Sequence, residues 1–193
     1  MEEFKIDYKF SLEDFKDMEK IEHSYFKDDN ISPAEECFNW YKKNDMTCVG
    51  IRNSHNKIIA SVSVLPLKQE VYNDILNNNM NEADVTNNQI EKYQDNCEYY
   101  IYLSSISIDS MYRNNYKLIT TLIKGCIVLF DSLIKRGITI KEVMADASTI
   151  HGEKICTKLL NMKYIRETNR ASKIYIVKGD EFIDIINKLK VKF

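Results

Sequence analysis

The segment from Ile106 to Ile123 combines a β-prone strand, a polar turn and the start of a long amphipathic pattern. A turn that leads into a helix N-terminus directs several backbone N–H groups at one place, and the helix dipole adds partial positive charge there. Arg113 and Lys117 flank this turn, and Lys124 follows two helical turns later. The pattern therefore indicates a site for a phosphate or pyrophosphate. The alternative is an ordinary strand-to-helix connection with charged residues on its surface.

Two further positions carry side chains that do chemistry. Asp146 ends a short apolar run, residues 143–145, and a carboxylate at the end of a central strand is a candidate general base. Its alternative role is to cap a helix that begins near Thr149. Cys156 and His151 together suggest a nucleophilic cysteine, but no third residue is evident that would orient the histidine. The alternative for Cys156 is a small buried apolar residue.

The cysteines and histidines do not suggest a metal centre. The five cysteines are scattered and form no C-x-x-C pair, which is typical of reduced thiols in a cytoplasmic protein. The three histidines are far apart in the sequence. We therefore expect no bound metal.

Length and composition favour one soluble domain over residues 1–193. Hydrophobic residues make up 44% of the chain and charged residues 29%, which are ordinary values for a globular protein. No apolar run approaches the roughly 18 residues that a membrane span needs. Met1–Phe4 has neither a basic nor an apolar leader region. No basic stripe with interleaved aromatic residues is present, so we expect neither a membrane nor a nucleic-acid partner.

Charge is distributed unevenly along the chain. Residues through Asp109 carry 11 basic and 21 acidic side chains, whereas the remainder carries 16 basic and 8 acidic ones. Residues 69–98 are rich in asparagine and carry seven acidic side chains against Lys92 alone. This polar acidic insertion would attract a cationic ligand. The alternative for the insertion is a solvated, mobile loop. The alternative for the uneven charge is that the acidic and basic halves of the chain simply attract each other.

Hydrophobic periodicity predicts a mixed α/β sheet with helices on both faces. The element order is β-α-α-β-β, the insertion, then β-α-β-α-β-β-α. The longest predicted helix follows the polar turn and is closed by Gly137. The expected strands are residues 4–10, 47–52, 57–67, 99–109, 143–145, 162–167 and 173–177; the expected helices are 12–26, 33–44, 117–136, 149–160 and a C-terminal helix within 180–193.

Over nearly its whole length the chain resembles the GNAT N-acetyltransferases. Residues 106–113, Ile-Ser-Ile-Asp-Ser-Met-Tyr-Arg, are similar to the family's stretch that leads into an Arg/Gln-x-x-Gly-x-Gly/Ala loop. Residues 158–163, Lys-Leu-Leu-Asn-Met-Lys, resemble the turn that closes the second motif helix. Residues 102–106 with 145–146 and 152–154 are similar to a less-studied bacterial branch. The resemblance implies a single-domain GNAT fold.

The resemblance also implies acetyl-CoA as co-substrate. Backbone groups of Ile106 and Ile108 would pair with the pantetheine arm, and the amides of the following loop would hold the pyrophosphate. Two loop residues depart from the pattern, since Tyr116 and Leu118 replace glycines that let a phosphate approach closely. The loop residues carried over are Arg113, Asn114, Asn115, Tyr116, Lys117 and Leu118.

For catalysis, the resemblance implies direct attack of an amine on the thioester. The position where the family often has an acidic base is Tyr102, and the position of its thiolate-protonating tyrosine is Cys156 or Thr157. Asp146 is the further candidate base. The implied acceptor is a primary amine on a small molecule, a polyamine or a peptide. The alternative is a catalytically degenerate module that binds a small ligand or partner protein, and a homodimer is left open.

Overall fold

A computed structural model describes residues 3–26 and 31–193. Met1 and Glu2, on which the expectation of no leader region rests in part, lie outside the described residues. The strands are β1 (Lys5–Asp7), β2 (Cys48–Arg52), β3 (Ile58–Leu67), β4 (Glu98–Ile108), β5 (Thr139–Ala147), β6 (Lys163–Glu167) and β7 (Lys173–Lys178). The α-helices are α1 (Leu12–Glu22), α2 (Ala34–Lys43), α3 (Gln69–Leu76), α4 (Tyr116–Lys135), α5 (Ile150–Lys154) and α6 (Gly179–Lys192). Short 3₁₀ turns are η2 (Glu82–Asp84), η3 (Asn87–Gln89) and η4 (Ser110–Tyr112), and η5 (Ile155–Leu159) is a π-helical turn.

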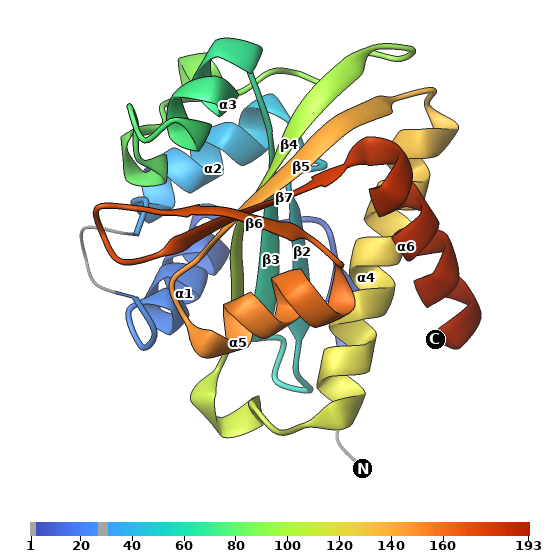
Figure 1. The fold of residues 1–193 in the computed structure, drawn as a ribbon. Coiled ribbons are helices and arrows are strands. Elements are labelled where there is room, and N and C mark those ends of the chain that lie inside the picture. The colour runs from blue at the N-terminus through green and yellow to red at the C-terminus, as the bar shows by residue number, and fades with distance from the viewer. Residues whose placement is uncertain (1–2, 27–30) are drawn as a thin grey trace.

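The described strands form one seven-stranded sheet in the order β1-β2-β3-β4-β5-β7-β6 (Figure 1). Only the central neighbours β4 and β5 run parallel; the other adjacent pairs are antiparallel. The predicted mixed sheet is confirmed. The strand expected at 143–145 is longer, because Thr139–Glu142 also pairs with the start of β4.

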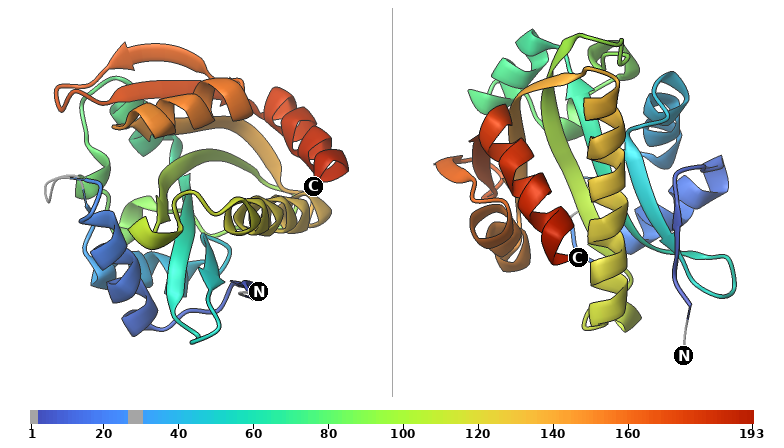
Figure 2. Two further views of the ribbon diagram at one scale, coloured as in Figure 1. Left: turned by 90° about the horizontal axis from the view of Figure 1, so that it is seen from below. Right: turned by 90° about the vertical axis from the view of Figure 1, so that its right-hand side faces the viewer.

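Helices cover both faces of the sheet, as predicted (Figure 2). On one face, Phe15 and Met18 of α1 pack against Ile58 of β3. On the other, α4 lies so close to β2 that a Cβ on Gly125 would stand 2.6 Å from a Val49 methyl carbon. A ring contact between Phe130 of α4 and Phe182 of α6 joins the two helices on that face, with centroids 4.8 Å apart.

Two local signals in the sequence are reproduced in detail. The Ser11 hydroxyl accepts from the Asp14 amide, and the Asp14 carboxylate accepts in return from the Ser11 amide, which completes a capping box at α1. Gly137 has φ +74°, the left-handed conformation that ends α4.

The acidic insertion is packed against the sheet. Its apolar residues are few, but Val71, Tyr72 and Ile75 of α3 are buried in one cluster with Tyr102 and Met144. The alternative interpretation of this segment as a solvated loop is therefore wrong for α3. It failed because the insertion's helix buries only one face, and the polar residues on the other face dominate its composition.

Candidate active site

The parallel pairing of β4 and β5 ends partway along both strands. Residues Glu98–Leu103 pair with Thr139–Ala145, and beyond that point β4 continues to Ile108 with β3 as its neighbour. At the same point β4 contains a bulge: Leu103 pairs with Val64 and Ser105 pairs with Ser63, so Ser104 is an extra residue. Bulges re-aim side chains and are frequent beside active sites. The end of the β4–β5 pairing and the bulge therefore mark one place in the fold.

A carboxyl group of the insertion reaches this bulge. The Tyr102 hydroxyl donates to Glu82 Oε2 at 3.0 Å, and the Ser104 hydroxyl donates to Glu82 Oε1. Burial raises the pKa of Glu82 to about 8, although both hydrogen bonds act in the opposite direction. Tyr102 is fully buried, and burial followed by the Glu82 charge raises its pKa well above the usual value. Tyr102 therefore acts here as a hydrogen-bond donor.

A second carboxyl group approaches from the end of α1. Glu22 is hydrogen-bonded to Ser105, the residue next to Ser104. Burial raises the pKa of Glu22, and the Ser105 contact partly offsets that effect. Because of the bulge, two successive serines reach carboxyl groups from two different elements, η2 and α1. Neither carboxyl group was singled out as a catalytic candidate from the sequence.

Asp146 lies on β5, opposite Ile174 of β7. Its Oδ1 atom is buried and has no hydrogen-bond partner in the described residues. Burial raises the pKa of Asp146, while the Ser172 hydroxyl and the charge of Arg166 lower it. Asp146 is not the cap of the following helix, because the Thr149 hydroxyl accepts from the Gly152 amide at 3.0 Å.

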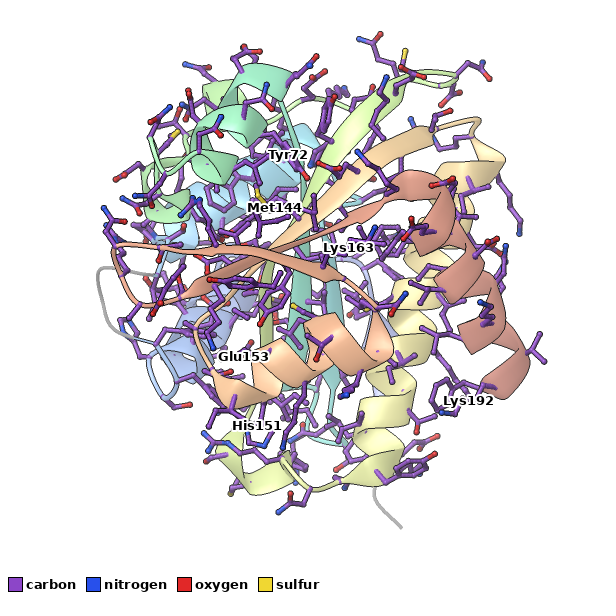
Figure 3. All side chains as sticks on the ribbon, in the orientation of Figure 1. Tyr72, Met144, His151, Glu153, Lys163 and Lys192 are labelled. Atoms are coloured by element: carbon purple, nitrogen blue, oxygen red, sulfur yellow. The ribbon has the colours of Figure 1, made fainter. Side chains whose placement is uncertain are left out.

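Cys156 is buried in the π-helical turn η5, and burial raises the pKa of its thiol to about 12. A thiol of this kind stays protonated at neutral pH. His151 is exposed near the start of α5 (Figure 3). The neighbouring Glu153 forms an ion pair with Lys173 at 2.9 Å. The structure gives no hydrogen bond between Cys156 and His151. A nucleophilic cysteine would need that hydrogen bond as well as a third residue to orient the histidine.

The turn before α4 is closed by its own side chains. Asp109 Oδ1 accepts from the Met111 amide at 3.0 Å, and Asn115 Oδ1 accepts from the Leu118 amide at 3.1 Å. The helix begins at Tyr116, one residue before the predicted start. The Tyr116 side chain is 74% exposed, whereas Leu118 is fully buried in the core. Neither residue that replaces a motif glycine therefore turns its side chain into the backbone of the turn.

Tyr25 forms hydrogen bonds with two of the groups that are assigned to the coenzyme. Its hydroxyl donates to the Ile108 carbonyl oxygen and accepts from Arg113 Nε. Asn114 lies between η4 and α4, and Lys117 Nζ lies 5.8 Å from the ring centroid of Phe4. Tyr25 gives no signal in the sequence, because its role depends on the path of the chain after α1.

Two negative findings concern the described residues alone. No group of three or more histidine, cysteine or acidic side chains in residues 3–26 and 31–193 is arranged to hold a metal ion. In the same part of the chain, no helix is long and apolar enough to cross a membrane.

No protein-family model matches the chain, and no curated protein matches it in sequence. Solved structures do match over most of the chain. Ard1 from Thermoplasma volcanium aligns with a TM-score of 0.55 at 11% identity, covering 90% of this chain and 94% of its own. The NatC complex bound to Gag peptide and CoA aligns with a TM-score of 0.56 at 9% identity, covering 91% and 98%. An acetyltransferase of the GNAT family from Staphylococcus aureus aligns with a TM-score of 0.53 at 10% identity, covering 91% and 99%. The chain therefore has the GNAT fold, as predicted.

Proposed function

We propose that the protein is an acetyl-CoA-dependent N-acetyltransferase that acts on a primary amine by direct attack. The observation that carries the proposal is the end of the β4–β5 pairing at Leu103 and Ala145, directly beside the carboxyl group of Glu82. A strand edge that lacks its neighbour offers backbone groups to an extended ligand. The same strand then leads, through η4, into the N-terminus of α4, where an anion is stabilised.

The turn before α4 fits a pyrophosphate in part. The outward side chain of Tyr116 and the inward side chain of Leu118 leave the backbone of the turn uncovered. The Leu118 amide, however, is already used by the Asn115 cap. Acetyl-CoA would supply the acetyl group as an activated thioester. The residues assigned to it are Ile106 and Ile108 through their backbone, and Arg113, Asn114, Asn115, Tyr116, Lys117 and Leu118 in the turn and helix start.

Of the proposed catalytic residues, Tyr102 and Asp146 lie on the two strands that separate. Tyr102 holds the Glu82 carboxyl group. Asp146 keeps one buried oxygen unpaired, which leaves an acceptor for a donor on the substrate. Cys156 lines the β5 side as a protonated thiol. With these groups, positioning of the amine and the thioester supplies most of the rate.

The proposed acceptor is a cationic amine on a small molecule, polyamine or peptide. The acidic residues of the insertion do not act as one surface, because Asp95 pairs with Arg136 and Glu98 pairs with Lys141. Glu82 is the acidic residue of the insertion that touches β4 at the bulge. Contact with the amine is thus assigned to this end of the insertion.

A second candidate is a GNAT-like module without catalysis. It is favoured by Tyr25, which engages both Arg113 and the Ile108 carbonyl group, and by the loss of both motif glycines. Such a module would bind a small ligand or a partner protein where the pairing of β4 with β5 ends.

Titration with acetyl-CoA, followed by thermal unfolding, separates the two candidates. Acetyl-CoA at 100-fold above its Kd would raise the free energy of unfolding by about 2.7 kcal/mol. Arg113→Glu is expected to abolish most of this shift, and Lys124→Glu, two turns into α4, serves as the matched charge control. Release of CoA thiol in the presence of a primary amine then tests transfer. The absence of a shift for the wild type at millimolar acetyl-CoA would favour the non-catalytic module.

A further inference from the structure

Glu82, in the insertion, forms hydrogen bonds through both of its carboxyl oxygens. Its two carboxyl oxygens accept from two residues of one strand, Tyr102 and Ser104, which lie on either side of Leu103. Tyr102 has no exposed surface, so one of these hydrogen bonds forms in the protein interior. The hydrogen-bonded carboxyl group is therefore fixed at the bulge of β4.

The insertion itself is tied to two other elements. Arg166 of β6 donates to the carbonyl oxygens of Ile75 and Leu76 at the C-terminal end of α3. Glu36 of α2 accepts from the Asn87 amide at 2.7 Å. These contacts hold the insertion on both sides of η2, so Glu82 is carried by a rigid support, as a catalytic group requires.

We infer that Glu82 is the catalytic base that removes the proton from the acceptor amine, and that Tyr102 and Ser104 position its carboxylate. This inference rests on the proposed acetyl transfer. It differs from the sequence-based assignment, which gave the base to Tyr102 or Asp146. It also gives the insertion a specific role, because the base comes from that segment and not from the strands of the sheet.

The chemical step balances with this residue. The cationic amine first loses one proton to solvent. The lone pair that this frees on the nitrogen then attacks the thioester carbonyl carbon, so that an N–C bond forms. The C–S bond breaks, and its electron pair leaves on sulfur. The proton released by the nitrogen passes to the Glu82 carboxylate and from there to solvent, and the thiolate takes a proton from solvent. The products are the amide and the free thiol of CoA.

The charged and titratable groups that face Glu82 come from every element packed around it. Tyr102 lies on β4, Glu22 on α1, Asp146 on β5, and the half-buried thiol of Cys37 on α2. The negative neighbours Glu22 and Asp146 add to burial in raising the pKa of Glu82 to about 8. A base with this pKa is half ionised near pH 8. The rate is therefore expected to rise with pH and to level off above that value.

The test compares Glu82→Gln with Asp84→Asn, a matched control on the same 3₁₀ turn that removes an exposed acid. CoA release is measured from pH 6 to 9.5 with spermidine, putrescine and an unblocked tetrapeptide as acceptors. Glu82→Gln is expected to lower kcat about 10²- to 10⁴-fold and to remove the rise near pH 8. Asp84→Asn is expected to leave both within about twofold, and acetyl-CoA should shift the unfolding temperature of both variants equally.

A Glu82→Gln enzyme that is folded, keeps kcat within about threefold and keeps the pH profile would overturn the assignment while leaving acetyl transfer intact. A wild type that acetylates none of the three probes would overturn acetyl transfer to amines, and this assignment with it. If Glu82→Gln is poorly folded, Glu82→Ala with added formate is the second test. Formate should raise kcat of the Glu82→Ala enzyme at least tenfold over its value without formate. A folded Glu82→Ala enzyme whose kcat does not respond to formate counts against a catalytic carboxylate.

Discussion

The hydroxyl of Tyr25 accepts a hydrogen bond from Arg113 Nε at 2.7 Å, and the Arg113 guanidinium carbon lies 4.1 Å from the centroid of the Tyr25 ring. The same hydroxyl donates to the Ile108 carbonyl oxygen. Tyr25 lies 83 positions before Ile108 and 88 positions before Arg113 in the sequence. Its hydroxyl thus joins the chain just after α1 to the strand and the turn that are assigned to the coenzyme. A phosphate that recruits Arg113 must compete with this contact.

Tyr25→Phe is therefore expected to tighten acetyl-CoA binding. The variant keeps the ring under the guanidinium and removes both hydrogen bonds of the hydroxyl. A net hydrogen bond is worth about 1 kcal/mol, which corresponds to a roughly fivefold lower Kd. Isothermal titration calorimetry measures the change, with Tyr41→Phe as a control because its hydroxyl bonds elsewhere, to the Tyr8 carbonyl. Weaker binding by Tyr25→Phe would show instead that the hydroxyl contacts the ligand.

Glu82→Gln is also expected to change how stability depends on pH. The pKa of Glu82 is about 8 in the folded protein and close to the ordinary 4.5 when unfolded. The folded state therefore binds the proton more tightly, and the stabilisation is complete below pH 4.5 and lost as pH rises through 8. The glutamine variant lacks this loss.

Thermal unfolding of both proteins from pH 5 to 9 measures the difference directly. The melting temperature of Glu82→Gln minus that of the wild type should increase from pH 5 to 8 and then stay constant. A difference that is flat across this range would mean that Glu82 ionises at its ordinary pH in the folded protein.

The sequence predicted the elements that depend on local patterns. The periodicity of α4 and the glycine after it defined the long helix to within a residue at each end, and β4 was evident from its aromatic and β-branched residues. The site depends on contacts between distant residues. The bulge at Ser104 exists only because Ser63 and Val64 pair on either side of it.

The position of Glu82 shows the same limit. It lies 20 residues before Tyr102, in a segment whose composition suggested a solvated loop. Counting its charge with six others indicated attraction of a cation. Its individual role follows only from the fold, in which η2 brings Glu82 to Tyr102 and Ser104 of β4. Composition measures charge but does not show which carboxyl group is buried.

Thr149→Ala and Asp146→Asn are expected to have different effects on the free energy of unfolding, because only Thr149 caps α5. Thr149 holds the first turn of α5, so its loss should lower the free energy of unfolding by about 1 kcal/mol. Asp146→Asn leaves that cap in place and removes a buried carboxyl group. Its stability at pH 7 should be equal to or higher than that of the wild type, as measured by urea unfolding. A larger loss for Asp146→Asn than for Thr149→Ala would show instead that the ionised Asp146 carboxylate stabilises the fold through Ser172 and Arg166.

Cys156→Ala is expected to reduce kcat less than tenfold. The thiol is 4% exposed and burial raises its pKa to about 12, so it neither attacks the thioester as a thiolate nor gives up a proton readily to the leaving sulfur. Removing one buried sulfur atom should cost about 1 kcal/mol of stability, and kcat must therefore be compared at equal folded fraction. CoA release by the variant, measured with the three amine probes, checks the expectation. A loss of more than a thousandfold in a folded enzyme would make Cys156 the acid that protonates the thiolate, or a nucleophile. Mass spectrometry of the wild type quenched during turnover decides between these two, because only a nucleophile carries the acetyl group on Cys156.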